Sequence, residues 1–542
     1  MKIQKILFTC MMLCSIIRVE AQAFSEEKFK PENYFDGIDP IATKRFNLGE
    51  SITREAIQLV INKATSEGIK IIIPSGVHRF QGITVNKNNI HIIFEQGVTI
   101  LPPDKNTPVF RIGSRSGIEN DSKGVDPIKN VKISGKGIVT INYEAAGKSN
   151  IKAFLLENVT NFMISNIKIL AKFPVSSGIT LSSPPTNLKI ADRFRAPIFN
   201  KFPTKGVLQN IEMQGANSGY GLIQVQGAKS ILFKNLTSTG GIALRLENGG
   251  STPAGSNFST ISELYAENIN CIKGNFAVLL APHIKNNGRV QLRNINANDC
   301  SFAIRSGPGF IDKKVPSQIK ELIQAGTFTP APLIGNVSAT KTEKGFAASA
   351  RLAKVDNKNY AFYPRAVTTQ TPFSSLEKAD DASPSRFAVP GGGIVVSSQL
   401  SENEIGPKKE GFYKVSIVGN VNLKGEFQNS EEKEIYKKSE ILYRKDNGRV
   451  NIPEKDENSL IAAKDYDSPN TEIYYDMNKK ILNLFVSSIA NLSIYNLSGI
   501  LLKEQTLSKG NQTVNLSNFD SGVYLVNINH NYNSHSKKIV IK

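Results

Sequence analysis

Six polar side chains between residues 220 and 283 have the types that an acid–base reaction needs. They supply a carboxylate, an imidazole, a guanidinium, a phenol and two amides: Glu247, His283, Arg245, Tyr220, Gln224 and Gln226. Short alternating apolar runs, separated by Asn- and Gly-rich turns, surround them. Because a β-strand points alternate side chains to opposite faces, a face with this many polar groups is not simply core. The segment therefore predicts a site on the flank of a stacked sheet.

Arg245 and Glu247 are two residues apart on one predicted strand, so their side chains share a face, about 6.5–7 Å apart along the backbone. Gln224 lies 23 residues earlier and His283 lies 36 later, which places both on adjacent coils of a stack. Adjacent coils are about 4.8 Å apart. A carboxyl group in such surroundings can act as a general acid. Burial would raise the pKa of Glu247 and Arg245 would lower it, so the sequence leaves the net direction open. An exposed, salt-bridged ladder on the protein surface is the alternative interpretation.

A quasi-repeat indicates how these strands are organised. An Asn followed by an aliphatic residue opens a short alternating strand at seven places: Asn89, Asn130, Asn166, Asn210, Asn235, Asn268 and Asn294. The last four lie 25, 33 and 26 residues apart. One coil of a three-faced parallel β-helix needs roughly 20 to 35 residues, and Asn at its turn tolerates left-handed backbone and can stack in a hydrogen-bonded ladder. The irregular spacing argues against a β-propeller. We therefore expect an all-β chain built on a parallel β-helix.

Other segments give the boundaries of this β-helix. Residues 53–68 have helical periodicity and suit a short helix that covers the open end of the stack. The repeat is lost over residues 308–390, which predicts an insertion containing a helix at 313–325. A large insertion beside a groove can act as a lid, and a decorative subdomain is the alternative. The β-helical domain is expected over residues 23–440.

The remaining parts of the chain are a linker, a small domain and an N-terminal signal. Charged residues predict a linker at 441–470, and alternating strands predict a compact β-sandwich at 471–542. Lys2 and Lys5 precede an apolar run that ends near small residues, which predicts a secretory signal peptide over residues 1–22. No later segment is apolar enough to predict a transmembrane helix.

Two cysteines follow the predicted signal peptide, Cys271 and Cys300. An oxidising compartment would allow them to pair. We favour two buried thiols in neighbouring coils, because free cysteine is among the most buried residue types.

The charge balance points to a polyanionic partner. The chain has 66 Lys and Arg against 47 Asp and Glu, a net charge of +19. Nucleic acid, anionic lipid and acidic polysaccharide are the classes that such a surface attracts. The basic residues are spread along the chain, which favours a long electropositive groove over a nucleic-acid-binding arm. No nucleic-acid partner is therefore expected.

Three segments resemble the iota-carrageenases, glycoside hydrolase family 82: Gly219-Tyr220-Gly221 with Gln224, the run GGIALRLENG from Gly240 to Gly249, and Ala281-Pro282-His283. The resemblance covers roughly residues 25–440. It implies a secreted, right-handed parallel β-helix that hydrolyses β-1,4 linkages of iota-carrageenan, a sulfated galactan, with inversion. It also implies that the insertion near 308–390 closes over the groove.

The resemblance also implies roles for single residues. Glu247 falls on the family's acid, while Gln224 and His283 fall on its glutamine and histidine. Tyr220 and Arg245 fall on positions linked with activity. One departure concerns the base, because Gly249 stands where the family has an aspartate.

Inverting hydrolysis needs a group that activates water, with the two carboxyls about 6.5–9.5 Å apart. Three explanations for Gly249 compete. Asp312, at the start of the insertion, can serve as base; His283 and Gln224 can position the water without a carboxylate base; or the protein is weak, inactive or altered in specificity. We favour an active enzyme with a non-standard base, and Asp312 is chosen from its position alone.

A sulfated galactan would be bound through its oxyanions, which arginine clamps bidentately. Candidates for this role are Arg245, Arg289, Arg293 and Arg305, and we expect Tyr220, Gln226, Arg245 and Arg305 to contact substrate. Surface charge is the alternative for each arginine. The expected chemistry needs no cofactor and no catalytic metal, and a structural calcium or other ion is left open. A monomer is expected.

The final segment resembles the C-terminal sorting domain of the type IX secretion system, on NLSIYNLSG, the SGVYLV strand and the terminal KKIVIK. A carbohydrate-binding module is the alternative. The resemblance implies the type IX secretion machinery as a partner and a secreted or cell-surface location.

Other functions of β-helices fit the sequence less well. A polygalacturonase needs paired aspartates with Gly-His-Gly and Arg-Ile-Lys motifs, and a pectate lyase needs a cluster of calcium-binding acids; none is found in the sequence. A lyase that uses Tyr220, Arg245 or His283 on a uronate polymer remains an alternative, as does a lyase or hydrolase of another acidic or sulfated polysaccharide. A non-catalytic adhesin that binds sulfated glycan is the second alternative.

Overall fold

The chain folds into two compact units, residues 1–452 and residues 453–542. The computed structural model describes residues 24–541 except 104–106, 114–125, 145–151, 173, 175, 185–200, 249–258, 299, 301, 308, 310, 312–323, 342–347, 352, 356–357, 365–385, 390–391, 397–410, 412, 426–434, 438–440, 446–471, 477–479, 487–489, 497–500 and 531–532. Between residues 348 and 396, and between 435 and 445, only the backbone is described.

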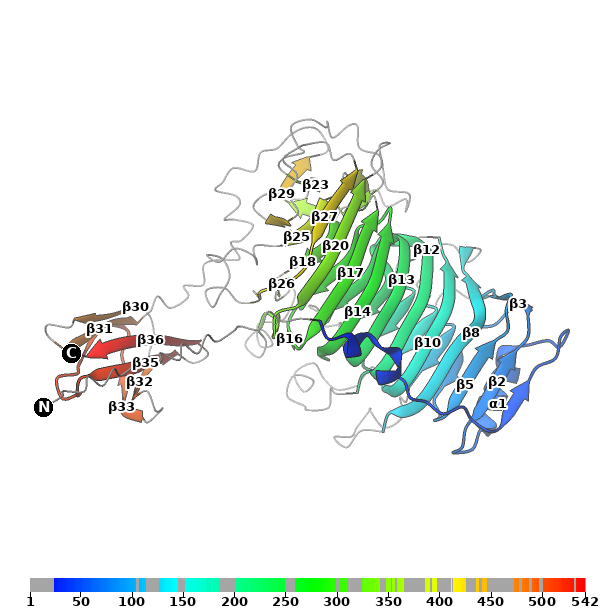
Figure 1. The fold of residues 1–542 in the computed structure, drawn as a ribbon, viewed down its shortest axis with the longest axis horizontal. Coiled ribbons are helices and arrows are strands. Elements are labelled where there is room, and N and C mark those ends of the chain that lie inside the picture. Colours follow the sequence, from blue (N-terminus) through cyan, green and yellow to red (C-terminus); the bar gives the residue numbers. More distant parts are fainter. Residues whose placement is uncertain are drawn as a thin grey trace, which may run out of the picture. The chain divides into compact units, whose positions relative to one another are not determined.

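The first unit is a right-handed parallel β-helix whose coils follow one another in chain order (Figure 1). The strands of its large sheet pair in parallel. They are β1 (Thr43–Arg45), β2 (Ile69–Ile73), β3 (Gly76–His78), β4 (Ile83–Val85), β5 (Ile90–Phe94), β6 (Val98–Ile100), β7 (Phe110–Ile112), β8 (Ile128–Asn142), β9 (Phe154–Leu156), β10 (Val159–Leu170), β11 (Ile179–Leu181), β12 (Thr204–Val225), β13 (Ala228–Glu247), β14 (Ile261–Ile272), β15 (Phe276–Ala281), β17 (Val290–Asn298), β18 (Phe302–Ser306), β20 (Leu333–Lys341), β25 (Gly392–Val396), β26 (Ser416–Ile417), β27 (Val421–Gly425) and β28 (Ile435–Lys437).

The paired strands of this sheet form two stacks. The front stack runs β2–β5–β8–β10–β12–β13–β14–β17–β20. The side stack runs β4–β7–β9–β11–β12–β13–β15–β18–β25. Strands β12 and β13 belong to both, because each is long enough to continue around a corner of the coil. The fold class expected from the Asn-aliphatic repeat is confirmed.

The predicted asparagine ladder is present along the β-helix. All seven asparagines have a left-handed backbone, with φ between 54° at Asn210 and 61° at Asn166. The amide of Asn235 donates to Asn210 at 2.9 Å, and that of Asn268 donates to Asn235 at 2.8 Å. Asn336, which the sequence analysis missed, extends the ladder by donating to Asn294 at 3.3 Å. Its Asn336-Val337 pair has the same Asn-aliphatic pattern as the others.

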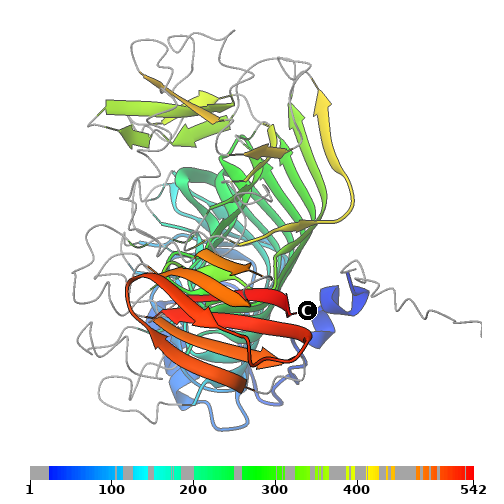
Figure 2. The same ribbon diagram turned by 90° about the vertical axis from the view of Figure 1, so that its left-hand side faces the viewer.

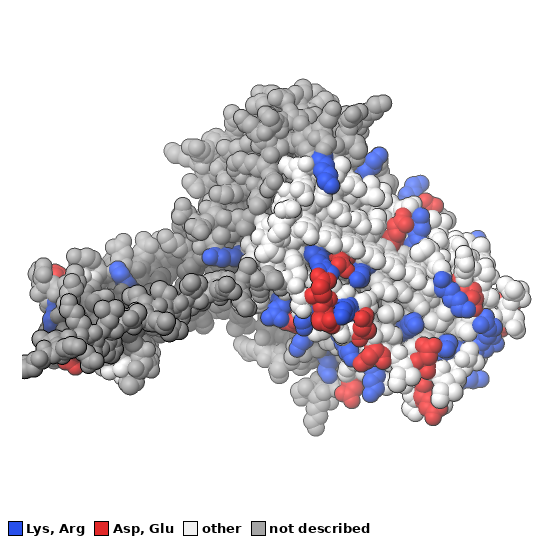
Figure 3. Space-filling view, in the orientation of Figure 1, with Lys and Arg blue, Asp and Glu red and all other residues white. Residues whose placement is uncertain are grey.

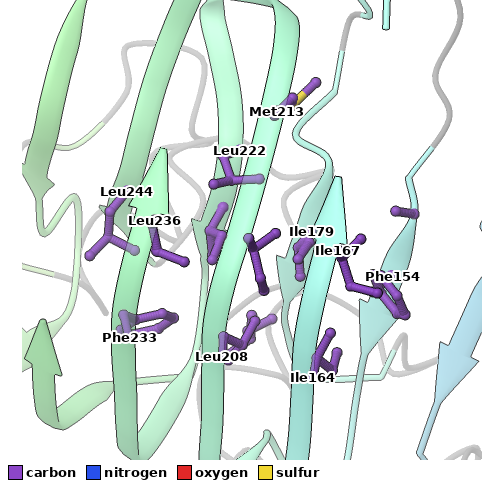
Figure 4. Close-up of a cluster of buried hydrophobic side chains, with 14 of the residues drawn as sticks. Phe154, Ile164, Ile167, Ile179, Leu208, Met213, Leu222, Phe233, Leu236 and Leu244 are labelled. Atoms are coloured by element: carbon purple, nitrogen blue, oxygen red, sulfur yellow. The ribbon is translucent and has the colours of Figure 1, made fainter. Parts of the chain in front are cut away.

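Aliphatic and phenylalanine side chains fill the interior of the coils. Figure 4 shows inward-pointing residues of successive strands, from Phe154 to Leu244, packed between the walls. Phe110 and Phe154 stack with ring centroids 5.3 Å apart. The alternation of buried and outward residues on β7 and β9 produces this column, because adjacent strands are in register.

The predicted helix over the first coils is α1 (Arg54–Lys63), which begins with a Thr53 hydroxyl accepting from the Ala56 amide. Ile57 and Ile61 are fully buried in the core. The helix ends at Lys63, earlier than the Gly68 expected from the sequence. Most of the helix expected at 313–325 lies outside the described residues.

An N-terminal segment packs along the outside of the front stack. It contains the 3-10 turns η1 (Glu26–Phe29) and η2 (Pro31–Asn33), which lie across the strands in Figure 1. Phe29 and Tyr34 cover an apolar stripe formed by Val207, Leu232 and Tyr265. Figure 3 shows that acidic and basic side chains intermingle on this face, so it carries no field of a single sign.

The predicted insertion at 308–390 is not continuous. Strand β20, at residues 333–341, returns to the front stack, and β19 (Thr327–Phe328) pairs with β16 (Asn286–Asn287). The rest of the described insertion includes β21 (Ala348–Arg351) paired with β24 (Arg386–Val389), and β22 (Ala353–Val355) paired with β23 (Lys358–Pro364). Strand β29 (Ile441–Lys445) joins β23, so a strand begins the predicted linker at 441–470. The sequence analysis did not predict β20, because its run of alternating apolar residues is short and lies between Pro-rich and Lys-rich segments.

The second unit has two antiparallel sheets, whose strands are seen in Figure 2. It also has a hydrophobic core of its own. One contains β30 (Glu472–Asp476), β31 (Ile481–Val486) and β34 (Gly510–Asn515). The other contains β33 (Leu501–Leu507), β32 (Ala490–Asn496), β35 (Gly522–His530) and β36 (Asn533–Ile541). This is the small β-sandwich that the alternating strands predict. Over the described residues, no helix has the length and apolar character that crossing a membrane requires.

Candidate active site

The side stack brings the candidate residues from separate coils onto one outer face. Gln224 of β12 is in register with Arg245 of β13, and Arg245 is in register with Leu279 of β15. Glu247 is the last residue of β13 and stands opposite Ala281, the last residue of β15. His283 follows two residues later in the turn after β15. The expected juxtaposition of a carboxyl, an amide and an imidazole is therefore present.

Both oxygens of the Glu247 carboxylate have partners. The Gln224 amide donates to Oε2 at 3.2 Å, and Nη2 of Arg245 donates to the same oxygen. Nε2 of His283 lies 3.4 Å from Oε1. The Glu247 side chain is 18% exposed, so it is largely desolvated and can still be reached from outside. The cluster is therefore largely buried and is not an exposed ladder of surface ion pairs.

The electrostatics of this cluster favour a charged carboxylate. Burial raises the pKa of Glu247, but Arg245, His283 and Gln224 together outweigh burial and lower the pKa to about 2. The sequence did not determine whether the pKa of Glu247 rises or falls; in the structure its neighbours have a larger effect than burial, so the pKa falls. In the free protein Glu247 is therefore ionised at neutral pH and cannot donate a proton in that state.

Arg245 has unused hydrogen-bonding capacity. Its side chain is 9% exposed, and Tyr220 covers it, with the guanidinium carbon 5.4 Å from the ring centroid. Within the described part of the chain, Nε and Nη1 of Arg245 have no hydrogen-bond partner. Buried donors without partners are costly, so these two nitrogens mark a place where a ligand oxygen would be stabilised.

The turn that carries His283 is held firmly. His283 has a left-handed backbone with φ of 42°, which is uncommon for a residue other than glycine. Its carbonyl accepts from the Gly326 amide at 2.5 Å, and the pairing of β16 with β19 closes the turn. These contacts fix the imidazole beside Glu247.

A buried amide pair behind the site was not found from the sequence. Asn248 and Asn287 donate to each other's side-chain oxygens, with Asn287 Nδ2 3.0 Å from Asn248 Oδ1. The pair joins the residue after Glu247 to the end of the His283 turn. No sequence signal distinguishes these asparagines from those of ordinary turns.

The other predicted residues have varied positions. Gln226 directly follows β12, and its backbone nitrogen donates to Leu181 at 2.8 Å. Arg305 lies in register with Leu279, two strands beyond Arg245, and its guanidinium carbon is 5.7 Å from the Phe276 ring centroid. Phe276 and Phe302 stack beside the site in an apolar cluster with Ile242. Asp312 and Gly249 lie outside the described residues.

Two arginines proposed as oxyanion clamps lie elsewhere. Arg293, on the front stack, forms ion pairs with Glu26 and Glu267 beneath the N-terminal segment. Arg289 lies 3.5 Å from Glu263, which also contacts Tyr265 of the front stack. Both therefore lie away from Glu247, because Arg293 is in β17, a strand of the front stack, and Arg289 directly precedes that strand.

The two cysteines are buried free thiols, as favoured from the sequence. Among the described residues there is no group of three His, Cys, Asp or Glu side chains that could hold a metal ion.

Comparison with known proteins finds sequence relatives among the iota-carrageenases. The chain is 32% identical over 269 residues to an iota-carrageenase of Alteromonas macleodii, covering 48% of this chain and 50% of that protein. It is 30% identical over 263 residues to an iota-carrageenase of Zobellia galactanivorans, covering 47% and 49%. The chain thus spans about half the length of the curated relatives it matches.

A solved structure extends the likeness over most of the fold. The iota-carrageenase of family GH82 from A. fortis, solved in the absence of chloride ions, superposes with a TM-score of 0.59 and 22% identity. The match covers 77% of this chain and 94% of that one. Residues 472–542 match the family described as the secretion system C-terminal sorting domain. The chain thus combines a β-helix similar in sequence and fold to iota-carrageenases with a secretion sorting domain at its C-terminus.

Proposed function

We propose that this protein is a secreted glycoside hydrolase that cleaves the β-1,4 linkages of iota-carrageenan with inversion. The observation that carries the proposal is the convergence of Gln224, Arg245 and His283 on the Glu247 carboxylate. They converge on the side of a β-helix similar to those of iota-carrageenases.

In this mechanism Glu247 protonates the oxygen of the leaving sugar. Gln224 and His283 hold the carboxyl group in place, since each contacts one of its oxygens. A water molecule attacks from the opposite side of the sugar ring, as inversion requires. We propose Asp312 as the group that activates this water; His283 and Gln224 orienting the water is the alternative.

The substrate's sulfate esters supply the second recognition element. Arg245 offers Nε and Nη1 to an oxyanion, and Tyr220 holds its guanidinium from one side. Arg305 lies two strands along the same face, so the two guanidinium groups can contact different sugars of one chain. Gln226 is proposed to contact the sugar next to the cleaved bond. Phe276, beneath Arg305, supports that arginine by a cation–π contact. No cofactor takes part in these steps.

We further propose that the protein acts as a monomer outside the cell. The match of residues 472–542 to a secretion sorting domain supports export by the type IX machinery, and the predicted signal peptide supports earlier passage across the inner membrane. The proposed partners are this machinery and the polysaccharide.

A panel of polymers tests the proposal. Purified protein is incubated with kappa-, iota- and lambda-carrageenan, agar and polygalacturonate, and reducing ends and ultraviolet absorbance are measured together. The proposal predicts new reducing ends from iota-carrageenan without ultraviolet absorbance, and an α-anomer as the first product in proton NMR.

Each alternative gives a different result in the same assay. A lyase would produce ultraviolet-absorbing unsaturated ends, and a hydrolase of other specificity would release reducing ends from another polymer. Binding of iota-carrageenan without new reducing ends would indicate an adhesin.

A further inference from the structure

The ionised state of Glu247 in the free protein conflicts with the role of an acid. Arg245 holds Oε2 of the carboxylate, and the neighbours keep the pKa of Glu247 at about 2. A general acid must carry a proton when the leaving group departs. Something must therefore change at this carboxylate between the free protein and the reacting complex.

The shape of the guanidinium group shows what can change. Its two bidentate edges are the Nε–Nη2 edge and the Nη1–Nη2 edge, and both include Nη2. Nη2 is the nitrogen that Glu247 occupies, whereas Nε and Nη1 have no partner among the described residues. Nη2 has two N–H bonds, one directed to each edge. A bidentate oxyanion on the edge that Glu247 uses must therefore compete with Glu247 for Nη2, and one on the other edge places its negative charge beside the same guanidinium.

We propose that a substrate sulfate takes Nη2 of Arg245 away from Glu247, and that the released carboxyl group then takes up the proton that it later donates. This inference rests on the proposed hydrolase function and adds a coupling between recognition and acid chemistry. The negative charge of the sulfate offsets the positive charge of Arg245, which had lowered the pKa of Glu247. The burial of Glu247 remains, and it favours the protonated, neutral carboxyl group. A polymer without sulfate at this position would bind without causing Glu247 to take up a proton.

Few other charged groups surround the pair in the described structure. Arg245 lies on the same strand, His283 lies in the turn after β15, and Tyr220 lies against Arg245. Gln224 on β12 is neutral, and Arg305 lies two strands further along. His283 is therefore the one nearby group among these that could take up the proton in place of Glu247, and the test must separate the two.

Proton uptake on binding tests the proposal directly. An iota-carrageenan oligosaccharide too short to be cleaved is titrated into the full-length protein at pH 6, by calorimetry in two buffers of different ionisation enthalpy. The wild type is expected to take up between about a half and one proton per bound oligosaccharide. Glu247→Gln should bind with no uptake, and His283→Asn should retain the uptake.

Two lysine substitutions complete the test. Arg245→Lys keeps the positive charge but has no bidentate edge, so both affinity and proton uptake should fall. The matched control is Arg289→Lys, on the other face, which should change neither. Wild-type binding without uptake, or loss of uptake in His283→Asn, would overturn the coupling while leaving the hydrolase function intact. Failure to bind the oligosaccharide, together with no reducing ends from the polymer, would overturn both.

Discussion

The proposed chemistry centres on the Glu247 carboxylate, at the end of β13. Its two oxygens are held by three side chains from three successive coils, and one of these, Arg245, keeps unused donors. The residues themselves were recognisable from the sequence, because polar types recurred on strands with alternating apolar residues. The direction in which the pKa of Glu247 shifts could not be predicted from the sequence, because it depends on which neighbouring charges come within contact distance.

The lowered pKa of Glu247 predicts how stability depends on pH. A carboxyl group whose pKa falls from 4.5 to about 2 on folding stabilises the folded state above pH 4.5, and this stabilisation is lost as the pH falls towards 2. The shift corresponds to about 3 kcal/mol. The difference in free energy of unfolding between wild type and Glu247→Gln should therefore shrink between pH 4.5 and pH 2. Denaturant unfolding measures it, with the exposed Glu55→Gln as a control whose difference stays small throughout.

The identity of the base can be tested by two substitutions. If Asp312 activates the water, Asp312→Asn should lower kcat by about 10² to 10⁴-fold, the usual contribution of a general base. His283→Asn should then change kcat less and shift the pH profile, because His283 contacts Glu247. Full activity in Asp312→Asn would exclude it as base and favour water held by His283 and Gln224.

At the scale of elements, the asparagine ladder sets the register that positions the site. Each ladder residue bends the chain with a left-handed backbone, and all but Asn89 lie within a strand that continues beyond the bend. A one-residue error at such a bend would therefore shift every outward side chain that follows it in the strand. The sequence identified seven rungs from the Asn-aliphatic pair. It missed Asn336 because the surrounding segment had lost its periodicity, and it therefore placed β20 in the insertion.

Substitutions at Asn235 separate the two contributions of a ladder residue. Asn235→Ala removes two side-chain hydrogen bonds and places an alanine in a left-handed backbone, which should cost about 2 kcal/mol. Asn235→Gly keeps the backbone relaxed and loses only the hydrogen bonds, so it should cost about 1 kcal/mol. Thermal unfolding compares them. Equal destabilisation by the two would show that backbone geometry contributes nothing here.

At the scale of the whole molecule, the chain has two units, each with its own hydrophobic core. The β-helical unit contains the candidate site, and residues 472–542 match a sorting domain. The sequence predicted this division from composition and from the two resemblances. It could not predict the N-terminal segment on the front stack, because the contacts of Phe29 and Tyr34 with Val207, Leu232 and Tyr265 join parts of the chain far apart in sequence.

Independence of the two cores predicts the effect of truncation. A chain ending at residue 452 should retain its melting temperature and its activity on iota-carrageenan in solution, since the core of the first unit includes no residue of the second. When expressed in a bacterium with type IX secretion, the shortened protein should accumulate inside the cell. Loss of activity in a truncated protein that still folds would show that the second unit takes part in catalysis.

The most direct measurement compares wild type and Glu247→Gln for release of reducing ends from iota-carrageenan, with circular dichroism to show that both are folded. The wild type should release reducing ends, and the variant should be slower by about 10² to 10⁴-fold, because its amide cannot protonate the leaving oxygen. Comparable activity in a folded Glu247→Gln protein would contradict the account, since the reaction would then take its proton from another group.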